Sequence, residues 1–335
     1  MNTPLLELRA VSKRFVKPLD FAARLGNVFG AGQREEVVHA VDGVSLAIAP
    51  GEVVGLVGES GCGKSTLGRM AVGLQTLSAG ERFLRGENIA ALQARLSHAE
   101  YRRQMLGIQM IFQDPYASLN PRLRVRDIVG EAPVAHGLIT RNEQDDYVAG
   151  LLSKVGLDAA FMRRYPHQFS GGQRARIGIA RALAVKPEFL VCDEAVAALD
   201  VSIQAQVLNL FIALRDELKL TYLFISHDLG VVRHLSDRVV IMYLGRVVES
   251  APADAVFAAP NHPYTQALLA EAPTLEVRKK TFVAIKGELP SPLAPPSGCH
   301  FHPRCPHAMQ RCKDEAPALR EIAAGWGSAC HLNDA

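Results

Sequence analysis

Residues 58–66 read GESGCGKST and combine three glycines, one lysine and three hydroxyl side chains directly after the apolar run VVGLV at residues 53–57. The spacing Gly-x4-Gly-Lys-Ser is that of a phosphate-binding loop, or P-loop, between a strand and a helix. Backbone N–H groups of such a loop surround a phosphate, Lys64 neutralises the β and γ oxygens, and Ser65 can bind Mg²⁺ at the helix N-terminus. A glycine-rich turn of purely structural use is the alternative, but the preceding strand favours phosphate binding. The predicted nucleotide contacts are Gly58, Ser60, Gly61, Cys62, Gly63, Lys64, Ser65 and Thr66.

Two carboxylates end a second apolar run, FLVCDE at residues 189–194. An acidic residue that leaves a buried strand beside a P-loop can hold Mg²⁺ through water, and we predict this role for Asp193. Its neighbour Glu194 can then accept a proton from an attacking water as general base. Alone, such a pair is usually a solvated strand end. A kinase does not need the second carboxylate, whereas a hydrolase does, so together with the P-loop the pair predicts nucleotide hydrolysis.

The elements that must position these residues alternate between strands and helices, which predicts an α/β fold with a parallel sheet. Two earlier strand patterns, at residues 5–11 and 37–48, predict an antiparallel pair with a loop-like insertion at 18–36 between them. Residues 90–167 have a polar, helical pattern and predict a mostly helical insertion. The remaining expected elements are strands at 53–57, 189–192 and 221–226, helices at 65–74, 173–184, 201–217 and 254–272, and a hairpin at 239–248.

Composition narrows the function class. The 335 residues include 37 basic and 34 acidic side chains, and the net charge of +3 is too small to indicate a nucleic acid or an anionic membrane surface as partner. No apolar run reaches about 18 residues, so we expect no membrane span. The start lacks the pattern of a secretory signal. We therefore expect a cytosolic chain in which structural disulfides among the six cysteines are improbable.

Further motifs resemble those of ATP-binding cassette (ABC) proteins. FSGGQ at residues 169–173 resembles the signature motif of that family, IFQDP at 111–115 its Q-loop, ALD at 198–200 its D-loop, and SHD at 226–228 its switch histidine. The motifs follow the order of the family over roughly residues 5–250. The resemblance implies a P-loop NTPase of the ABC type, with a RecA-like parallel sheet core, an antiparallel β arm and a helical subdomain.

The resemblance also implies residue roles. The signature closes on the nucleotide of a facing cassette, so that two ATP molecules are sandwiched and dimer closure controls hydrolysis. Glu194, His227 and Gln113 are the implied catalytic residues, with His227 at the γ-phosphate and Gln113 sensing Mg²⁺ and the attacking water. Phe15 is the implied adenine-stacking residue, and Mg²⁺ binding falls to Ser65, Gln113 and Asp193. The implied contacts to the facing nucleotide are Ser170, Gly171, Gly172, Gln173 and Asp200.

Other stretches resemble the ATPase subunits of bacterial dipeptide and oligopeptide importers, and most of all their second, F-type subunit. They are GESGCGKS, FQDPYASLNP at 112–121, DVSIQAQ at 200–206, NHPYTQAL at 261–268 and GELPSP at 287–292. The resemblance implies two membrane-spanning permease subunits, a second related ATPase and a periplasmic binding protein as partners. It places the chain peripherally on the cytoplasmic face of the inner membrane. Nickel, glutathione and opine importers share this architecture.

The resemblance divides the chain into a nucleotide-binding domain at residues 1–250, whose helical subdomain covers about 90–175, and a C-terminal extension at 251–335. A stiff proline-rich stretch at 290–296 leads into a cysteine-rich segment within residues 287–335. Its spacing, Cys299-x5-Cys305-x6-Cys312-x17-Cys330, lacks the C-x2-C pairs of common zinc ribbons. Four thiolates can hold one metal or cluster, and the resemblance implies a [4Fe–4S] cluster. Zinc and free thiols are the alternatives, with His300, His302, His307 and His331 as substitute ligands.

Two other function classes are weighed against a transport ATPase. A soluble ABC ATPase of repair or translation would bind nucleic acid, but such proteins usually carry two cassettes or a long coiled-coil insertion. A non-catalytic regulatory subunit would not need Lys64, Asp193, Glu194 and His227 together. We therefore expect an ATPase whose cofactor is Mg²⁺ and whose hydrolysis of ATP drives peptide import.

Overall fold

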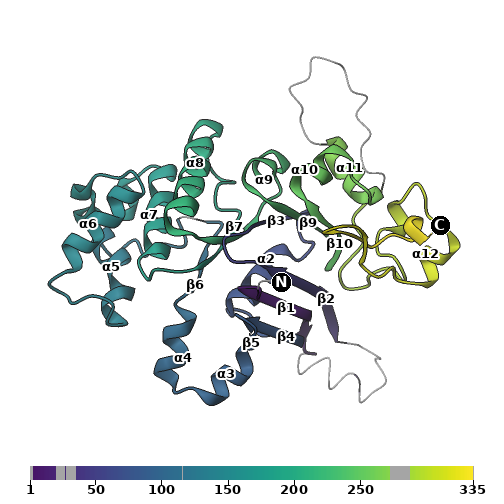
Figure 1. The fold of residues 1–335 in the computed structure, drawn as a ribbon, viewed down its shortest axis with the longest axis horizontal. Coiled ribbons are helices and arrows are strands. Elements are labelled where there is room, and N and C mark those ends of the chain that lie inside the picture. The colour runs from purple at the N-terminus through teal and green to yellow at the C-terminus, as the bar shows by residue number, and fades with distance from the viewer. Residues whose placement is uncertain (1–2, 20–26, 28–34, 115, 272–286, 335) are drawn as a thin grey trace.

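The computed structural model describes residues 3–19, 27, 35–114, 116–271 and 287–334. Within these residues a central sheet of eight strands runs through the molecule (Figure 1). Its spatial order is β11 (Arg320–Ala323), β12 (Trp326–Ser328), β10 (Arg246–Pro252), β9 (Arg238–Tyr243), β3 (Val53–Val57), β8 (Thr221–Ile225), β7 (Phe189–Asp193) and β6 (Ile108–Ile111).

The part of the sheet from β9 to β6 is parallel, as the alternation of strands and helices predicted. Every residue of β3, β7 and β8 is buried, as expected for strands covered on both faces. The prediction for residues 90–167 was wrong at one point, because β6 lies inside the stretch expected to be helical. Its four residues pair in parallel with β7, and so short a run gives little periodicity to detect.

A second, antiparallel sheet forms the arm. Its spatial order is β2 (Glu36–Ile48), β1 (Leu6–Lys17), β4 (Ala79–Leu84) and β5 (Glu87–Asn88). The predicted pairing of the first two strands is confirmed, whereas β4 and β5 were not expected. Most of the expected insertion at residues 18–36 lies outside the described residues. Helix α2 (Lys64–Val72) packs between the two sheets, since Leu67 and Met70 are fully buried in the core that both sheets share.

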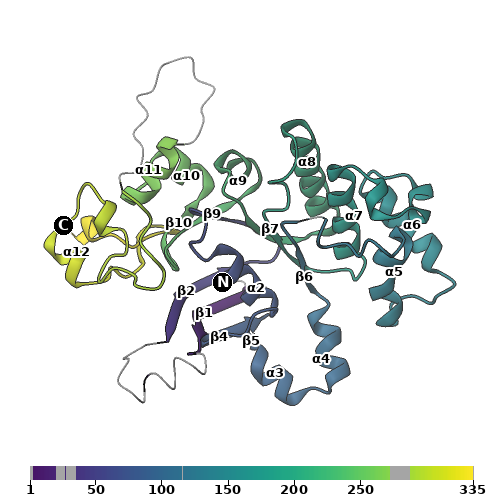
Figure 2. The ribbon, with the colours of Figure 1, turned by 180° about the vertical axis from the view of Figure 1, so that it is seen from behind.

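The helices follow the two faces of the central sheet (Figures 1 and 2). α8 (Val201–Leu218), α9 (Leu229–Leu235), α10 (Ala253–Ala258) and α11 (Pro263–Glu271) lie along one face, and α2 with the arm lies along the other. α5 (Val125–Ala135), α6 (Gln144–Lys154) and α7 (Gly171–Leu183) gather near β6 and share one apolar core with α8. α3 (Ile89–Arg95) and α4 (His98–Met105) lie beside the arm. None of the described helices has the length and apolar character that crossing a bilayer requires.

The single helix expected at residues 254–272 is two helices, α10 and α11, and residue 272 lies outside the described part of the chain. The break contains Pro260, which lacks a backbone N–H and disfavours helical geometry at the residue before it. Pro263 begins α11, a position where the missing N–H costs nothing.

The C-terminal segment packs onto the cassette instead of forming a core of its own. Strand β12 pairs with β10, and Phe301 packs against Tyr243 and Tyr264 with ring centroids 5.2 and 5.4 Å away. All three rings are buried in one apolar cluster. The expected domain division at residue 250 stays a prediction, and β10 continues across it. The segment, which includes α12 (Gln310–Asp314), lies at the end of the sheet opposite α5 and α6 (Figure 2).

Candidate functional site

The P-loop connects β3 to α2 and is closed on one side by β2. Gly63 has φ 104°, and a Cβ atom there would lie 2.0 Å from the carbonyl oxygen of Ala40, so only glycine fits. Lys64 is buried, and its Nζ donates to the carbonyl oxygens of Gly58 at 2.7 Å and Glu59 at 3.0 Å. The ammonium group therefore lies within the loop. The loop can offer this group and the N-terminus of α2 to a phosphate.

Ser65 and Asp193 meet at the end of the P-loop. The Ser65 hydroxyl donates to Oδ1 of Asp193 over 2.7 Å, and the aspartate is 1% exposed. Burial raises the pKa of Asp193, and the hydrogen bond from Ser65 opposes that rise. A hydroxyl and a carboxylate are oxygen ligands of the kind that Mg²⁺ prefers. The two residues predicted to hold the metal thus form one oxygen pair, in which Asp193 is buried and Ser65 half-buried.

Glu194 lies next to this pair and is contacted by both other predicted catalytic residues. Gln113 donates from Nε2 to Oε2 of Glu194 over 2.8 Å, and Nδ1 of His227 lies 3.4 Å from the same oxygen. The three follow β6, β7 and β8, whose carboxyl ends meet at one edge of the sheet. Glu194 itself has φ 47°, a conformation that is uncommon for residues other than glycine and concentrates at functional sites.

The signature residues begin α7. Ser170 is the N-cap: its Oγ accepts from the N–H of Gln173 at 3.3 Å, and the Gln173 side chain accepts in return from the N–H of Ser170 at 3.0 Å. Gly172 packs against α8, where Asp200 is the N-cap. Among the described residues, no hydrogen bond or ion pair joins Ser170 or Gln173 to the P-loop of the same chain.

The remaining predicted nucleotide contacts lie around the loop. Ser60 and Gly61 form its exposed tip, while Cys62 is buried under it. Phe15 lies on the arm with 41% of its surface exposed and pairs with Val38 on β2, two residues from Ala40, the residue that closes the loop. The ammonium of Lys13 lies 5.2 Å from the centre of the Phe15 ring. An exposed ring on the strand pair beside the loop is available for stacking.

The four cysteines of the C-terminal segment line one small cavity, although up to 31 residues separate them. All four are free thiols, and Cys312 is the most buried. Burial raises the pKa of Cys299 to about 11, and the other three cysteines add to the rise. In the described part of the chain no group of three or more His, Cys, Asp or Glu side chains is arranged to hold a metal ion.

Three of the four histidines predicted as substitute ligands have contacts of their own. Both ring nitrogens of His331 have partners, Asp334 and the carbonyl of Glu315. Nδ1 of His302 contacts the carbonyl oxygen of Cys299. His300 contacts the carbonyl oxygen of Leu244 and does not line the cavity, whereas His307 does. The four thiols are therefore better placed as ligands than His300, His302 and His331, and His307 is the histidine that stays a candidate substitute.

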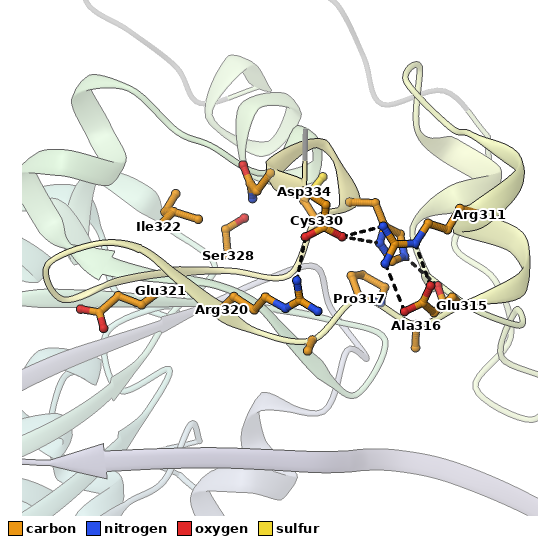
Figure 3. A pocket seen from close by; sticks show the side chains of 13 residues that line it. Arg311, Glu315, Ala316, Pro317, Arg320, Glu321, Ile322, Ser328, Cys330 and Asp334 are labelled. Carbon is orange, nitrogen blue, oxygen red and sulfur yellow. Dashed lines mark hydrogen bonds and ion pairs between the residues drawn. The ribbon is translucent and has the colours of Figure 1, made fainter.

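Cys330 also lines a second pocket, of about 330 Å³, on the outer side of the C-terminal segment (Figure 3). Arg311 and Arg320 point into it from opposite sides and both pair with the carboxylate of Asp334, at 2.8 and 3.0 Å. Arg311 pairs with Glu315 as well. Both arginines of this pocket are thus paired with carboxylates of the pocket itself.

Two contacts to the P-loop were not predicted from the sequence. Arg304 of the C-terminal segment pairs with Glu59 inside the loop, and Tyr264 of α11 accepts a hydrogen bond from the Glu59 N–H. No local pattern signals either contact, because the Arg304–Glu59 pair spans 245 residues and the Tyr264 bond 205.

Known proteins resemble the chain over nearly its whole length. Residues 41–197 match the family described as ABC transporter, and residues 248–312 match the family described as oligopeptide/dipeptide transporter, C-terminal region. The oligopeptide transport ATP-binding protein AppF of Bacillus subtilis (strain 168) is 48% identical over 332 residues, which cover 98% of this chain and 97% of AppF. The dipeptide transport ATP-binding protein DppF of Haemophilus influenzae is 44% identical over 331 residues, with 98% and 97% covered.

Solved structures of ABC cassettes also resemble the chain. The dimeric ATP-binding cassette MJ0796 bound to ADP and phosphate has a TM-score of 0.61 and 25% identity, and the match covers 74% of this chain and 98% of that one. The cbiO1 protein of Clostridium perfringens, part of an ABC transporter complex, has the same TM-score, with 77% and 92% covered. The predicted α/β cassette fold is thereby confirmed. The chain is an ATPase and belongs to the ABC transporter family, in the group of oligopeptide and dipeptide transport ATP-binding proteins.

Proposed function

We propose that this ATPase powers the import of dipeptides or oligopeptides across the inner membrane. The observation that carries the proposal is the match of residues 248–312 to the C-terminal region of oligopeptide and dipeptide transporters, in a chain 48% identical to AppF over 98% of its length. A generic cassette would not need this region. Import of nickel, glutathione or opines by the same architecture is the second candidate.

In the proposed reaction the chain's own residues position the phosphates and move one proton. Lys64 neutralises the β and γ oxygens of ATP. Glu194 accepts the proton of the attacking water, and we assign this to Oε1, since the contacts of Gln113 and His227 both go to Oε2. Gln113 holds the carboxylate in place. His227 would contact the γ-phosphate.

The oxygen pair of Ser65 and Asp193 fits Mg²⁺, because a buried carboxylate and a half-buried hydroxyl are joined by a 2.7 Å hydrogen bond that a cation can replace. Ser65 would bind the ion directly, Asp193 through water, and Gln113 would approach it from β6. When bound, Mg²⁺ would neutralise charge on the β- and γ-phosphate oxygens. The buried carboxylate gains a counter-charge in this way, which offsets the burial that raises its pKa.

The second half of each nucleotide site is proposed to come from a facing cassette. Ser170, Gly171, Gly172 and Gln173 offer the N-terminus of α7, a 13-residue helix, as an anion site. None of the described hydrogen bonds connects Ser170 to its own P-loop, which supports a role on an opposing ATP. Asp200 at the start of α8 would line the same interface. The similar cassette MJ0796 is dimeric in its structure with ADP and phosphate bound.

The proposed partners are two membrane-spanning permease subunits, a second related ATPase and a periplasmic binding protein, and no nucleic acid. The chain would dock peripherally on the cytoplasmic face of the inner membrane. Purification of a tagged copy from membranes, followed by mass spectrometry, should recover permeases and a sibling ATPase. Recovery of nucleic acid or ribosomal proteins instead would contradict the proposal.

The cargo is tested by reconstitution. The purified complex is placed in liposomes and the binding protein is added outside. Labelled dipeptide or oligopeptide should be taken up only when ATP is enclosed in the liposomes, on the side that the ATPase faces. The control is the same complex with Lys64→Ala. Uptake of nickel, glutathione or an opine, without peptide uptake, would assign the second candidate.

We also propose that Cys299, Cys305, Cys312 and Cys330 hold a [4Fe–4S] cluster. Four free thiols around one cavity fit the Cys₄ ligand set of such a cluster. A single zinc ion on the same thiols is the alternative; it would need sulfurs within about 4 Å of one another, given Zn–S bonds of about 2.3 Å, and the sequence lacks the C-x2-C pairs of common zinc ribbons. The cluster would cross-link the ends of a segment that has no core of its own.

The cluster is tested by anaerobic purification of the full chain. We expect a brown protein with broad visible absorbance and about four iron atoms per chain. Cys312→Ser should lose iron, whereas Cys192→Ser, at a fully buried cysteine on β7, should retain it. A colourless protein that contains zinc, or no metal, would refute the assignment.

A further inference from the structure

One arginine connects the cysteine-rich segment to the P-loop. Arg304 ends the short helix His302–Arg304, between Cys299 and Cys305 in the sequence. Its Nη1 lies 2.9 and 3.0 Å from the two carboxylate oxygens of Glu59, the second residue of the P-loop. The Arg304 side chain is 7% exposed and that of Glu59 23%. Removal of either partner of an ion pair this well shielded from water leaves the other charge uncompensated, so each side chain depends on the other.

Glu59 is held from two further directions. Its N–H donates to the hydroxyl of Tyr264 over 2.9 Å, and its carbonyl oxygen accepts from Nζ of Lys64 at 3.0 Å. Tyr264 is fully buried and packs against Tyr243, whose hydroxyl lies 3.4 Å from Nη1 of Arg304. The side chain, N–H and carbonyl of one loop residue are therefore fixed by Arg304, Tyr264 and Lys64 respectively.

The backbone of the cysteine segment fixes the position of Arg304 in turn. The Arg304 N–H donates to the carbonyl oxygen of Phe301 at 3.0 Å, and the Cys299 N–H donates to that of Cys312 at 2.8 Å. Nε of Arg304 is buried with no hydrogen-bond partner in the described part of the chain. The guanidinium is thus held mainly through Nη1, and the contact to Glu59 depends on where the cysteine segment places Arg304.

We propose that Arg304 is a positioning residue for ATP: it holds Glu59 and so keeps the P-loop in the conformation that presents Lys64 to the phosphates. The inference rests on the proposed nucleotide site at this loop. Arg304 contacts neither the oxygen pair of Ser65 and Asp193 nor Glu194, so its loss should weaken ATP binding and raise KM with little effect on kcat. If Arg304 had a purely structural role, its replacement would lower the amount of folded protein and leave the KM of the remaining protein unchanged.

The test measures ATP affinity with Mg²⁺ by calorimetry, and KM and kcat for hydrolysis, on the full chain in its transporter complex. Arg304→Gln and Glu59→Gln should each weaken ATP binding by about tenfold, which corresponds to about 1.4 kcal/mol. The double variant should be no weaker than either single variant, because both remove the same contact. Arg304→Lys should retain part of the affinity. Arg311→Gln, whose partners Glu315 and Asp334 lie within the C-terminal segment, should leave it unchanged.

Additive losses in the double variant, or an unchanged KM in Glu59→Gln, would overturn the inference. Should Arg304→Gln fail to fold, Glu59→Gln decides, because its side chain is the more exposed member of the pair. If the unaltered chain binds no ATP, the proposed nucleotide site fails. If the unaltered chain and both single variants bind ATP equally well, the positioning role alone fails.

Discussion

Gln113 donates a hydrogen bond from Nε2 to Oε2 of Glu194 over 2.8 Å, although 81 residues separate the two. The register of the sheet brings them together. Ile111 of β6 pairs with Cys192 of β7, and the two side chains each lie two residues beyond that pair. Gln113 also begins the stretch that leads from the sheet to α5 and α6. We therefore expect a movement of that helical region to reach the proposed general base through the side chain of Gln113.

Replacement of that base should separate binding from hydrolysis. Glu194→Gln keeps an acceptor oxygen for Gln113 but cannot take a proton, so we expect ATP turnover to fall about 100-fold or more. Binding of ATP should be retained, because the P-loop contacts of Lys64 are unchanged. Phosphate release and calorimetry measure the two effects.

The matched control is Glu188→Gln. This carboxylate precedes the other end of the same strand and pairs at the surface with Arg85, remote from the P-loop. Turnover should be unchanged. Full hydrolysis by Glu194→Gln would show that another group accepts the proton.

The buried oxygen pair should make hydrolysis sensitive to Mg²⁺ and to pH. Asp193→Asn should raise the Mg²⁺ concentration for half-maximal activity about 10- to 100-fold, the usual effect of losing a residue that supports a metal through its ligands. In the unaltered protein, burial raises the pKa of Asp193, so protons compete with Mg²⁺ at a higher pH than they would at an exposed aspartate. The half-maximal Mg²⁺ concentration should therefore rise as the pH falls.

Titrations of activity against Mg²⁺ at several pH values check both effects. Asp216→Asn, on the exposed side of α8, serves as the control and should titrate like the unaltered protein. A Mg²⁺ requirement that does not change in Asp193→Asn would remove this residue from the proposed metal site.

The contact between α7 and α8 leaves no room at Gly172. A Cβ atom there would lie 2.4 Å from Cγ2 of Ile203, a branched methyl that cannot rotate away without moving the other branch. Gly172→Ala should therefore destabilise the chain by about 1–3 kcal/mol and shift the start of α7, which lowers hydrolysis. Denaturant unfolding and ATPase assays measure the two losses.

A second substitution tests the cause. Ile203→Ala removes the obstructing methyl, so the double variant Gly172→Ala with Ile203→Ala should recover activity. Gly178→Ala, on the same helix but with no atom within 4 Å of the added Cβ, should be tolerated. Equal losses at both glycines would point to the helix itself and not to the contact with Ile203.

The features predicted best from the sequence are those that depend on neighbouring residues and on the ends of parallel strands. The P-loop lies between its strand and helix as expected, and the residues after three different strands meet at one edge because parallel strands end there together. The helical stretch expected at 254–272 is divided into α10 and α11, because Pro260 lies in the break between them. Strand β6 was missed because its four residues, IQMI, cover only two periods of a strand pattern and follow the polar helix α4.

Contacts between distant segments could not be predicted. Nothing near Arg304 indicates that it reaches Glu59, since the pairing depends on how β12 joins β10 and how Phe301 packs on Tyr243. The four cysteines were expected to act together from their spacing, but their shared cavity depends on the same packing. Tertiary packing, which no local pattern encodes, decides both.

A buried histidine beside the C-terminal segment, His262, predicts that the folded chain loses stability in mild acid. His262 is 1% exposed, and its Nδ1 accepts from the N–H of Tyr264 at 3.0 Å. Burial lowers the pKa of His262 from 6.5 to about 4. Between these values the unfolded chain binds a proton that the folded chain does not, so stability falls as the pH falls through this window. A shift of this size corresponds to about 3 kcal/mol.

Thermal unfolding between pH 7 and pH 4.5, without nucleotide, measures the effect. His262→Asn offers an acceptor oxygen close to the position of Nδ1 and does not titrate, so its melting temperature should depend less steeply on pH, even though it starts lower at pH 7. His98→Asn, at an exposed position on α4, should keep the full slope. The buried ring explains the acid sensitivity only if the two variants differ; parallel curves for His262→Asn and the unaltered protein would assign it to other groups.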